Sequence, residues 1–236
     1  NDLIQSELYK NSLLVAQRNT HILYYDCTNF FFEIEQEEGL RQYGISKEHR
    51  PNPIVQMGLF MDGDGIPLAF NISPGNTNEQ VTLTPLEEKL LQDFKLSKLV
   101  VCTDAGLASA ANRKFNDKKD RAFITTQSIK KLKKPLQEWA LDKTGWRIPG
   151  KDGLFDISKI DTDEAVAEAY KSTTFYKERW IKENGFEQRL VVTFSLKYRY
   201  YQRSVRQSQI ERAMKAIEKN PQKIGKTNQN DYKRFI

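Results

Sequence analysis

Runs of apolar residues separated by polar turns dominate the first half of the chain and predict a series of strands. The runs place strands at 21–35, 54–61, 66–72, 99–103 and 122–125. Amphipathic or capped segments predict helices at 2–17, 82–94 and 107–117. The resulting order after the leading helix, β-β-β-α-β-α-β, predicts an α/β domain built on a mixed five-stranded sheet.

Turn signals set the boundaries between these strands. Asp62-Gly63-Asp64-Gly65 predicts a tight hairpin between the second and third strands. Residues 36–53 are polar and carry glycines and prolines, so they predict a long loop before the second strand. The first three strands should therefore pair as neighbours along the chain.

Two of the apolar runs end in an aspartate. Asp26 follows the run Ile22–Tyr25, and Asp104 follows Leu99–Thr103. A helical crossover between strands favours parallel pairing, which would place both carboxylates at one edge of the sheet. Adjacent carboxylates repel each other, and a divalent cation between them relieves that repulsion. The alternative is that each aspartate only caps the helix that follows it.

The second half of the chain has a different pattern. Strands are predicted at 175–181 and 186–196, followed by a basic helix at 198–219. We divide the chain into a leading helix (1–20), a core (21–128), a β-containing insertion (129–196), and a basic helix with a truncated C-terminal end (197–236). Trp139, Trp146 and Trp180 are interpreted as packing residues.

Positive charge is concentrated near the C-terminus. The chain has a formal net charge of +6, yet residues 195–236 hold eleven Lys or Arg against three Asp or Glu. Arg199, Arg203 and Arg206 alternate with tyrosines there, and Lys130 and Lys131 belong to a second basic stretch. This mixture favours a polyanion such as DNA as the partner, although a solvated helix face is the alternative.

Composition excludes several other classes of protein. Two cysteines and two histidines are too few for a disulfide scaffold or a zinc cluster, and they fit a reducing cytoplasm. The sequence contains neither an apolar run of the roughly 18 residues that a membrane span needs nor a signal-peptide pattern at its start.

Five short pieces of sequence, in order, resemble a known family. They are Tyr24–Thr28 with Phe31 and Glu33, then residues 44–52, 65–68, 74–79 and 103–107. Together they resemble the catalytic core of bacterial insertion-sequence transposases of the DDE type, in the insertion-sequence-four-like group. The likeness extends over about residues 20 to 220 and implies an RNase H-like fold.

The resemblance implies a function and a site. Asp26 and Asp104 match the first two acidic ligands of a catalytic Mg²⁺, for which Mn²⁺ can substitute. The implied activity is cleavage and transfer of double-stranded DNA, at transposon ends and target, by a full-length homodimer on DNA. The implied location is the cytoplasm at the nucleoid, with no membrane association.

The third acidic ligand of the family is not found at its expected spacing. The family pattern is Tyr, two residues, Arg, three residues, Glu, six residues, Lys; Tyr200 and Arg203 fit, but Gln207 and Met214 stand at the other positions. We therefore expect the third glutamate beyond Ile236. Two alternatives stay open: a non-catalytic DNA-binding remnant, and another RNase H-like nuclease that completes its carboxylate set with Glu187 or Glu211.

Overall fold

The computed structural model describes residues 2–219 of the chain, so the predicted C-terminal end at 220–236 lies outside the described residues. The chain divides after Leu132 into two compact units, which we call unit 1 (residues 1–132) and unit 2 (residues 133–236). No helix among residues 2–219 is both long and apolar enough to cross a membrane.

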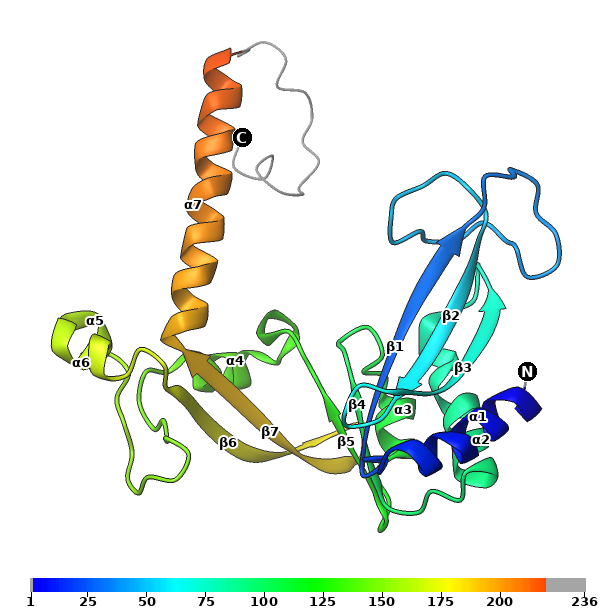
Figure 1. Ribbon diagram of the computed structural model, residues 1–236. Helices are drawn as coiled ribbons and strands as arrows, with labels where there is room; N and C mark the ends of the chain where they lie inside the picture. The colour runs from blue at the N-terminus through cyan, green and yellow to red at the C-terminus, as the bar shows by residue number, and fades with distance from the viewer. Residues whose placement is uncertain (1, 220–236) are drawn as a thin grey trace. The chain divides into compact units, whose positions relative to one another are not determined.

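Unit 1 is built on a five-stranded mixed sheet (Figure 1). The strands are β1 (Ile22–Phe31), β2 (Ile54–Met61), β3 (Pro67–Pro74), β4 (Leu99–Thr103) and β5 (Arg121–Thr125). Their order is β3-β2-β1-β4-β5. The β1–β2 and β2–β3 pairs are antiparallel, whereas β1–β4 and β4–β5 are parallel. This arrangement confirms the predicted RNase H-like sheet.

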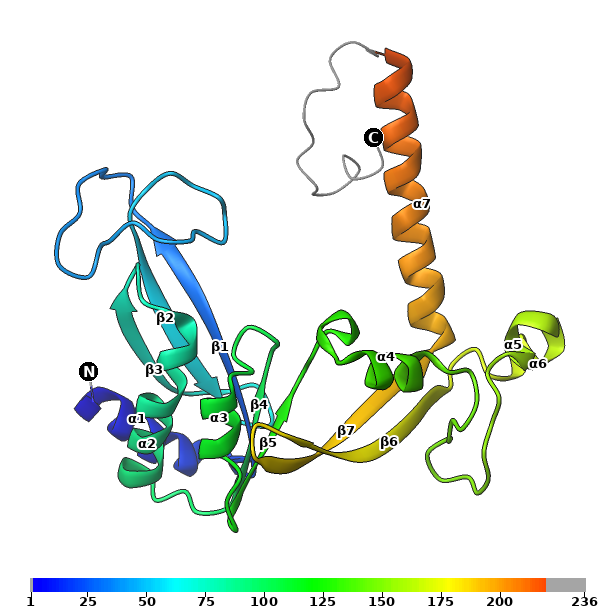
Figure 2. The ribbon, with the colours of Figure 1, turned by 180° about the vertical axis from the view of Figure 1, so that it is seen from behind.

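Helices cover one face of this sheet. They are α1 (Asp2–Val15), the short 3₁₀ turn η1 (Glu79–Val81), α2 (Leu83–Asp93) and α3 (Ala110–Phe115). Figure 2 shows α2 and α3 over the same face. Alternate residues of β1, Leu23, Tyr25 and Cys27, point into the core against α2, because side chains of a strand alternate between its two faces.

The other face of β1 stays exposed. Tyr24 is 41% exposed and Phe30 is 54% exposed, and Asp26 lies between them on the same face. On β5, Ile124 is 62% exposed. The sheet of unit 1 thus buries one face and leaves apolar side chains uncovered on the other.

The long loop between β1 and β2 crosses the end of β3 at two glycines. Gly75 donates its N–H to the carbonyl of Leu40 at 3.1 Å. A Cβ atom on Gly44 would overlap the carbonyl of Gly75, and one on Gly75 would overlap the backbone oxygens of Ile54 and Gln42. Only residues without a side chain allow this close approach.

Replacing Gly75 with alanine should therefore push the loop away from β3. We expect Gly75→Ala to lower the free energy of unfolding by about 1–3 kcal/mol, the usual cost of overpacking. Urea denaturation followed by circular dichroism measures it. The neighbouring exposed Asn76 provides the control, since Asn76→Ala should leave stability nearly unchanged. Equal stability of Gly75→Ala and wild type would contradict the close crossing.

A buried glutamate lies on the covered side of the sheet. Glu87 of α2 is fully buried. Asn116 donates its side-chain N–H to Glu87 Oε2 at 2.9 Å, and the Arg121 guanidinium lies 3.4 Å from Oε1. Burial raises the pKa of Glu87 despite these two partners. Because its folded pKa is raised, Glu87 binds its proton more tightly in the folded chain than in the unfolded chain.

This proton preference predicts how stability depends on pH. The contribution of Glu87 should be most favourable below its ordinary pKa of 4.5 and should decline as the pH rises through the folded pKa. Denaturation of wild type and Glu87→Gln across this range isolates the effect. The difference in unfolding free energy, wild type minus variant, should fall with rising pH; a difference that rises would refute the assignment.

Unit 2 contains a hairpin followed by a long helix, as predicted. The hairpin joins β6 (Thr174–Glu183) to β7 (Phe186–Ser195), and α7 (Leu196–Lys219) follows directly. An aromatic cluster packs against the hairpin, with ring centroids of Phe155 and Phe175 5.0 Å apart and those of Phe155 and Tyr170 4.9 Å apart.

Short helices in unit 2 were not predicted. They are α4 (Lys134–Leu141), α5 (Lys159–Thr162) and α6 (Glu164–Ala169), together with a 3₁₀ turn, η2 (Ile129–Lys131), at the end of unit 1. Helices of four to eight residues span too few turns to show a clear apolar periodicity. The described part of the segment expected to be β-containing therefore holds one hairpin and several short helices.

Candidate active site

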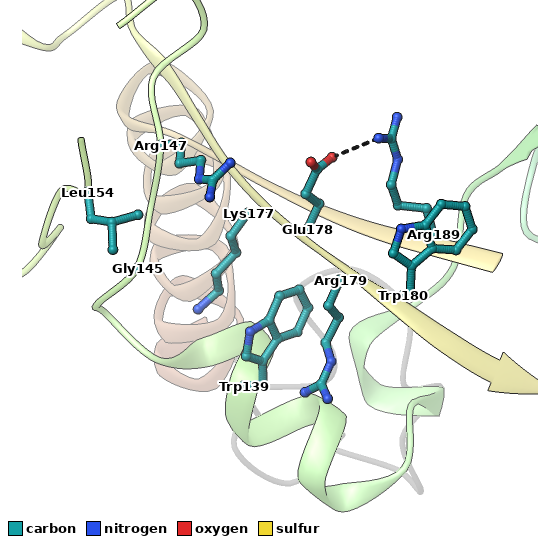
Figure 3. A pocket seen from close by; sticks show the side chains of 9 residues that line it. All are labelled: Trp139, Gly145, Arg147, Leu154, Lys177, Glu178, Arg179, Trp180 and Arg189. Carbon is teal, nitrogen blue, oxygen red and sulfur yellow. Dashed lines mark ion pairs between the residues drawn. The ribbon is translucent and has the colours of Figure 1, made fainter. Parts of the chain in front are cut away.

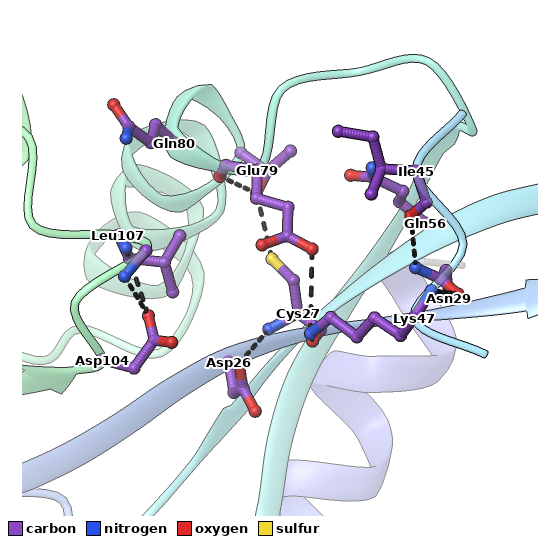
Figure 4. Close-up of polar contacts among 12 residues, drawn as sticks. Asp26, Cys27, Asn29, Ile45, Lys47, Gln56, Glu79, Gln80, Asp104 and Leu107 are labelled. Atoms are coloured by element: carbon purple, nitrogen blue, oxygen red, sulfur yellow. Dashed lines mark hydrogen bonds and ion pairs between the residues drawn. The ribbon is translucent and has the colours of Figure 1, made fainter. Parts of the chain in front are cut away.

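The parallel register of β1 and β4 brings the two predicted aspartates together. The paired residues run from Ile22 with Val100 to Tyr25 with Thr103. Asp26 is the next residue of β1, Asp104 is the first residue after β4, and both are exposed. Figure 4 shows Asp104 where β4 ends and Asp26 on β1, which continues for five more residues, so the expectation of two strand-end aspartates holds only for Asp104.

Each aspartate is oriented by backbone donors. Asp26 Oδ1 accepts the N–H of Cys27 at 2.8 Å. Asp104 Oδ1 accepts the N–H groups of Gly106 at 2.9 Å and Leu107 at 3.2 Å. Asp104 thus closes the turn after β4, whereas the cap of α3 is Ser109, which accepts the N–H of Asn112. Neither aspartate caps a helix, so the capping alternative is wrong for both.

The second oxygen of each carboxylate remains available. Within residues 2–219, both carboxylates are bonded through Oδ1, and Oδ2 of Asp26 and Oδ2 of Asp104 take part in no hydrogen bond and no ion pair. Exposed carboxylate oxygens on adjacent strands suit a hard cation such as Mg²⁺, which is commonly held by one or two carboxylates and keeps several waters. The donor chemistry of this pair therefore fits a divalent metal ion.

A third carboxylate does not join this pair among the described residues. Within residues 2–219, no group of three Asp, Glu, His or Cys side chains is arranged to hold a metal ion. The two candidates considered from the sequence lie in unit 2: Glu187 is on β7, and Glu211 is on α7, where it accepts a hydrogen bond from Gln207.

A buried polar cluster supports β1 beneath the aspartates. The hydroxyl groups of Tyr25 and Thr82 are 2.7 Å apart, and the thiol of Cys27 lies 3.5 Å from each of them. Burial raises the pKa of both Tyr25 and Cys27. Burial also raises the pKa of the Cys102 thiol. Protonated thiols are poor nucleophiles, and only Cys27 is buried, whereas Cys102 is partly exposed.

One charged residue at the site had no predicted role. The Lys47 ammonium donates to the carbonyl of Cys27 and lies 3.7 Å from Glu79 Oε1 (Figure 4). Asn29 of β1 accepts the Lys47 N–H and donates to the carbonyl of Ile45, both at 3.2 Å. In the sequence, Lys47 lies in the piece 44–52 that resembles the transposase family, but only the fold of that loop shows that its ammonium reaches β1.

The predicted DNA-binding residues are spread over both units. Lys130 and Lys131 are exposed on η2 in unit 1, and Arg203 and Arg206 are exposed on α7 in unit 2. Arg199 differs, because its guanidinium is 2.7 Å from Asp161 and its side chain is only 23% exposed. Its contacts within unit 2 indicate a structural contribution that the sequence pattern did not reveal.

A second basic and aromatic feature is a hollow of about 240 Å³ beside the hairpin of unit 2 (Figure 3). Lys177 lies buried in its wall, donating to the carbonyl of Asp142 at 2.8 Å and lying 5.3 Å from the Trp139 ring. On the other side of Trp139, the Arg179 guanidinium is 5.4 Å from the ring. The hollow is also lined by Arg147, Trp180 and Arg189.

The three tryptophans of unit 2 therefore differ in their surroundings. Trp146 is almost fully buried, in agreement with the packing interpretation. Trp180 is 69% exposed, so the packing interpretation is wrong for this residue. Its partner across the hairpin is Arg189, and a strand that is covered on one face only exposes every second side chain.

Comparison with protein families assigns the chain to a class. Residues 20–217 match the model of the transposase DDE domain family, so the chain belongs to that family. No curated protein matches the sequence.

Solved transposase structures show more distant likeness. A Mos1 transposase paired-end complex with its left transposon end is 14% identical, covering 52% of this chain and 40% of that chain at a TM-score of 0.32. The Mos1 mariner catalytic domain is 12% identical, covering 54% of this chain and 59% of that chain at 0.31. A piggyBac transposase synaptic complex with hairpin DNA is 11% identical, with coverages of 72% and 32% and a TM-score of 0.35.

Proposed function

We propose that unit 1 is the catalytic core of a DNA transposase in which Asp26 and Asp104 hold Mg²⁺, with Mn²⁺ as a substitute. The family assignment supports the reaction class. The observation that carries the site is the β1–β4 register, which makes the two aspartates neighbours on the exposed face of the sheet. The insertion-sequence-four-like group remains part of this proposal.

The chain's own residues prepare the site for phosphodiester chemistry. When bound, the metal would polarise the phosphodiester and activate water or a DNA 3′-hydroxyl group for attack. Cys27 N–H fixes the orientation of the Asp26 carboxylate, and the turn at Gly106 and Leu107 fixes that of Asp104. Preorganised ligands lower the cost of binding because less freedom is lost.

We infer that the third carboxylate comes from outside unit 1, on a helix that covers the exposed face of the sheet. Tyr24 and Phe30 flank Asp26 on that face and are more than one third exposed. A helix packed on these side chains would bury them and bring its own acidic residue to the aspartates. The sequence-based expectation of a glutamate beyond Ile236 agrees with this inference.

One test replaces each aspartate in turn and measures DNA cleavage. Asp26→Asn and Asp104→Asn keep the shape of the side chain but remove the charge that binds the metal. Loss of a residue that only supports a metal ligand typically lowers activity by roughly 10–100-fold. Because these aspartates would bind the metal themselves, we expect a larger loss of DNA cleavage, with DNA binding nearly unchanged.

The exposed hairpin residue Asp64 provides the matched control, because Asp64→Asn makes the same change away from the site. Cleavage is followed on a labelled transposon end, and binding by gel shift. Near-normal cleavage by either Asp26→Asn or Asp104→Asn would exclude the proposed role.

We also propose that α7 contributes phosphate contacts through Arg203 and Arg206, and that Arg199 serves unit 2 internally. Arg203→Ala should leave thermal unfolding unchanged. It should reduce the slope of log affinity against log salt for duplex binding by about 1, which corresponds to one phosphate contact. Arg199→Ala should destabilise unit 2 by about 1 kcal/mol or less, as expected for a partly exposed ion pair.

Fluorescence anisotropy of a labelled duplex at several salt concentrations, with differential scanning calorimetry, separates these two effects. The opposite pattern, in which Arg203→Ala unfolds early and keeps the full salt dependence, would contradict the assignment.

A further inference from the structure

Strand β1 continues beyond the end of its parallel neighbour β4, which leaves an open edge next to Asp26. The His21 carbonyl accepts the N–H of Val100 on β4. Because backbone groups of alternate residues in a strand point to the same side, the N–H and carbonyl of Cys27 face the β4 side as well. β4 has ended at Thr103, so no strand residue pairs with Cys27 there.

Two side chains take the place of the missing strand. Asp26 Oδ1 accepts the Cys27 N–H, and the Lys47 ammonium donates to the Cys27 carbonyl. The carboxylate of a proposed metal ligand and a lysine ammonium therefore occupy one short edge of β1. Buried or edge backbone groups need such partners, which explains why the arrangement is stable without a strand.

The backbone of Lys47 is held in place from several directions. Asn29 of β1 bonds to the N–H of Lys47 and to the carbonyl of Ile45. The N–H of His49 reaches the carbonyl of Ser46 at 3.0 Å, which closes a turn around Lys47. The fold of the loop thus fixes the backbone from which the Lys47 side chain extends to β1.

The ammonium remains accessible despite its contact with β1. The Lys47 side chain is 46% exposed, and its acidic partner Glu79 is 31% exposed at a distance of 3.7 Å. An ion pair between partly exposed groups adds little to stability. A lysine ammonium has three donors, and the contacts with Cys27 and Glu79 leave it able to turn toward a ligand.

We propose that Lys47 binds the phosphate group on which Asp26 and Asp104 act. This inference rests on the proposed function. A phosphodiester is negatively charged and is repelled by two carboxylates, and a cation on the same strand edge offsets that repulsion. Lysine is a compact charge that binds phosphate oxygens without the planar geometry that arginine demands. Lys47 is then a catalytic residue, because it touches the substrate.

The alternative is that Lys47 only fastens the loop to β1. The two explanations differ in what a substitution changes. A fastening role predicts a loss of stability and of metal binding, because the edge of β1 that orients Asp26 would be disturbed. Phosphate binding predicts an effect on the salt dependence of DNA binding, with metal binding preserved.

The test compares Lys47→Met with Lys47→Arg and with a matched control. Methionine keeps the apolar stem, and arginine keeps the charge. Lys10→Met is the control, because Lys10 is an exposed lysine of α1 paired only locally with Glu7. Mn²⁺ binding to the 236-residue chain is measured by titration calorimetry. Binding of a fluorescent DNA duplex is measured by anisotropy, with Mn²⁺ present, between about 50 and 200 mM salt.

We expect Lys47→Met to reduce the slope of log affinity against log salt by about 0.9, which corresponds to one phosphate contact. Lys47→Arg and Lys10→Met should keep the wild-type slope, and all three variants should bind Mn²⁺ as wild type does. An unchanged slope in Lys47→Met, or loss of its Mn²⁺ binding, would overturn the role of Lys47.

The same titration separates this inference from the function on which it rests. Asp26→Asn should lose Mn²⁺ binding. If it does so while Lys47→Met keeps the full slope, the role of Lys47 fails and the proposed function stands. If Asp26→Asn binds Mn²⁺ like wild type, the proposed function itself fails.

Discussion

The parallel pairing of β1 with β4 is the constraint on which the site depends. It makes two carboxylates neighbours, and like charges in such a position favour the binding of a cation. The opposite face of β1 holds the strand in place: Leu23, Tyr25 and Cys27 are buried in the core, and the Tyr25 and Thr82 hydroxyl groups bond to each other. Because the side chains of β1 alternate between the two faces, burying one set leaves the Asp26 carboxylate on the exposed face.

The end of β4 gives the site its second property. Where β4 stops, β1 continues alone, and side chains satisfy its open edge. The loop that supplies Lys47 reaches this edge because Gly44 and Gly75 let two backbones approach closely. The fold therefore brings the aspartates and Lys47 together at the open edge of β1. The negative charge of a phosphodiester can bind there to a metal ion and to the lysine ammonium.

Much of this arrangement could be predicted from local patterns. The bounds of β2 and β4 agree with the sequence prediction because an apolar run and a turn signal mark each end. The neighbouring positions of Asp26 and Asp104 follow from a general rule for parallel strands. Lys47 could not be found this way, since its place depends on a loop whose path is set by contacts distant in sequence. The pairing of Arg199 with Asp161 and the exposure of Trp180 also depend on tertiary structure, so residue types alone did not predict them.

The measurement that tests the central claim most directly is a crystal structure of the chain soaked in Mn²⁺, with the metal located by its anomalous scattering. The account predicts a peak within coordination distance of both Asp26 and Asp104, on the sheet face that carries Tyr24. A peak elsewhere with none between these carboxylates, or aspartates that point to opposite faces of the sheet, would contradict it.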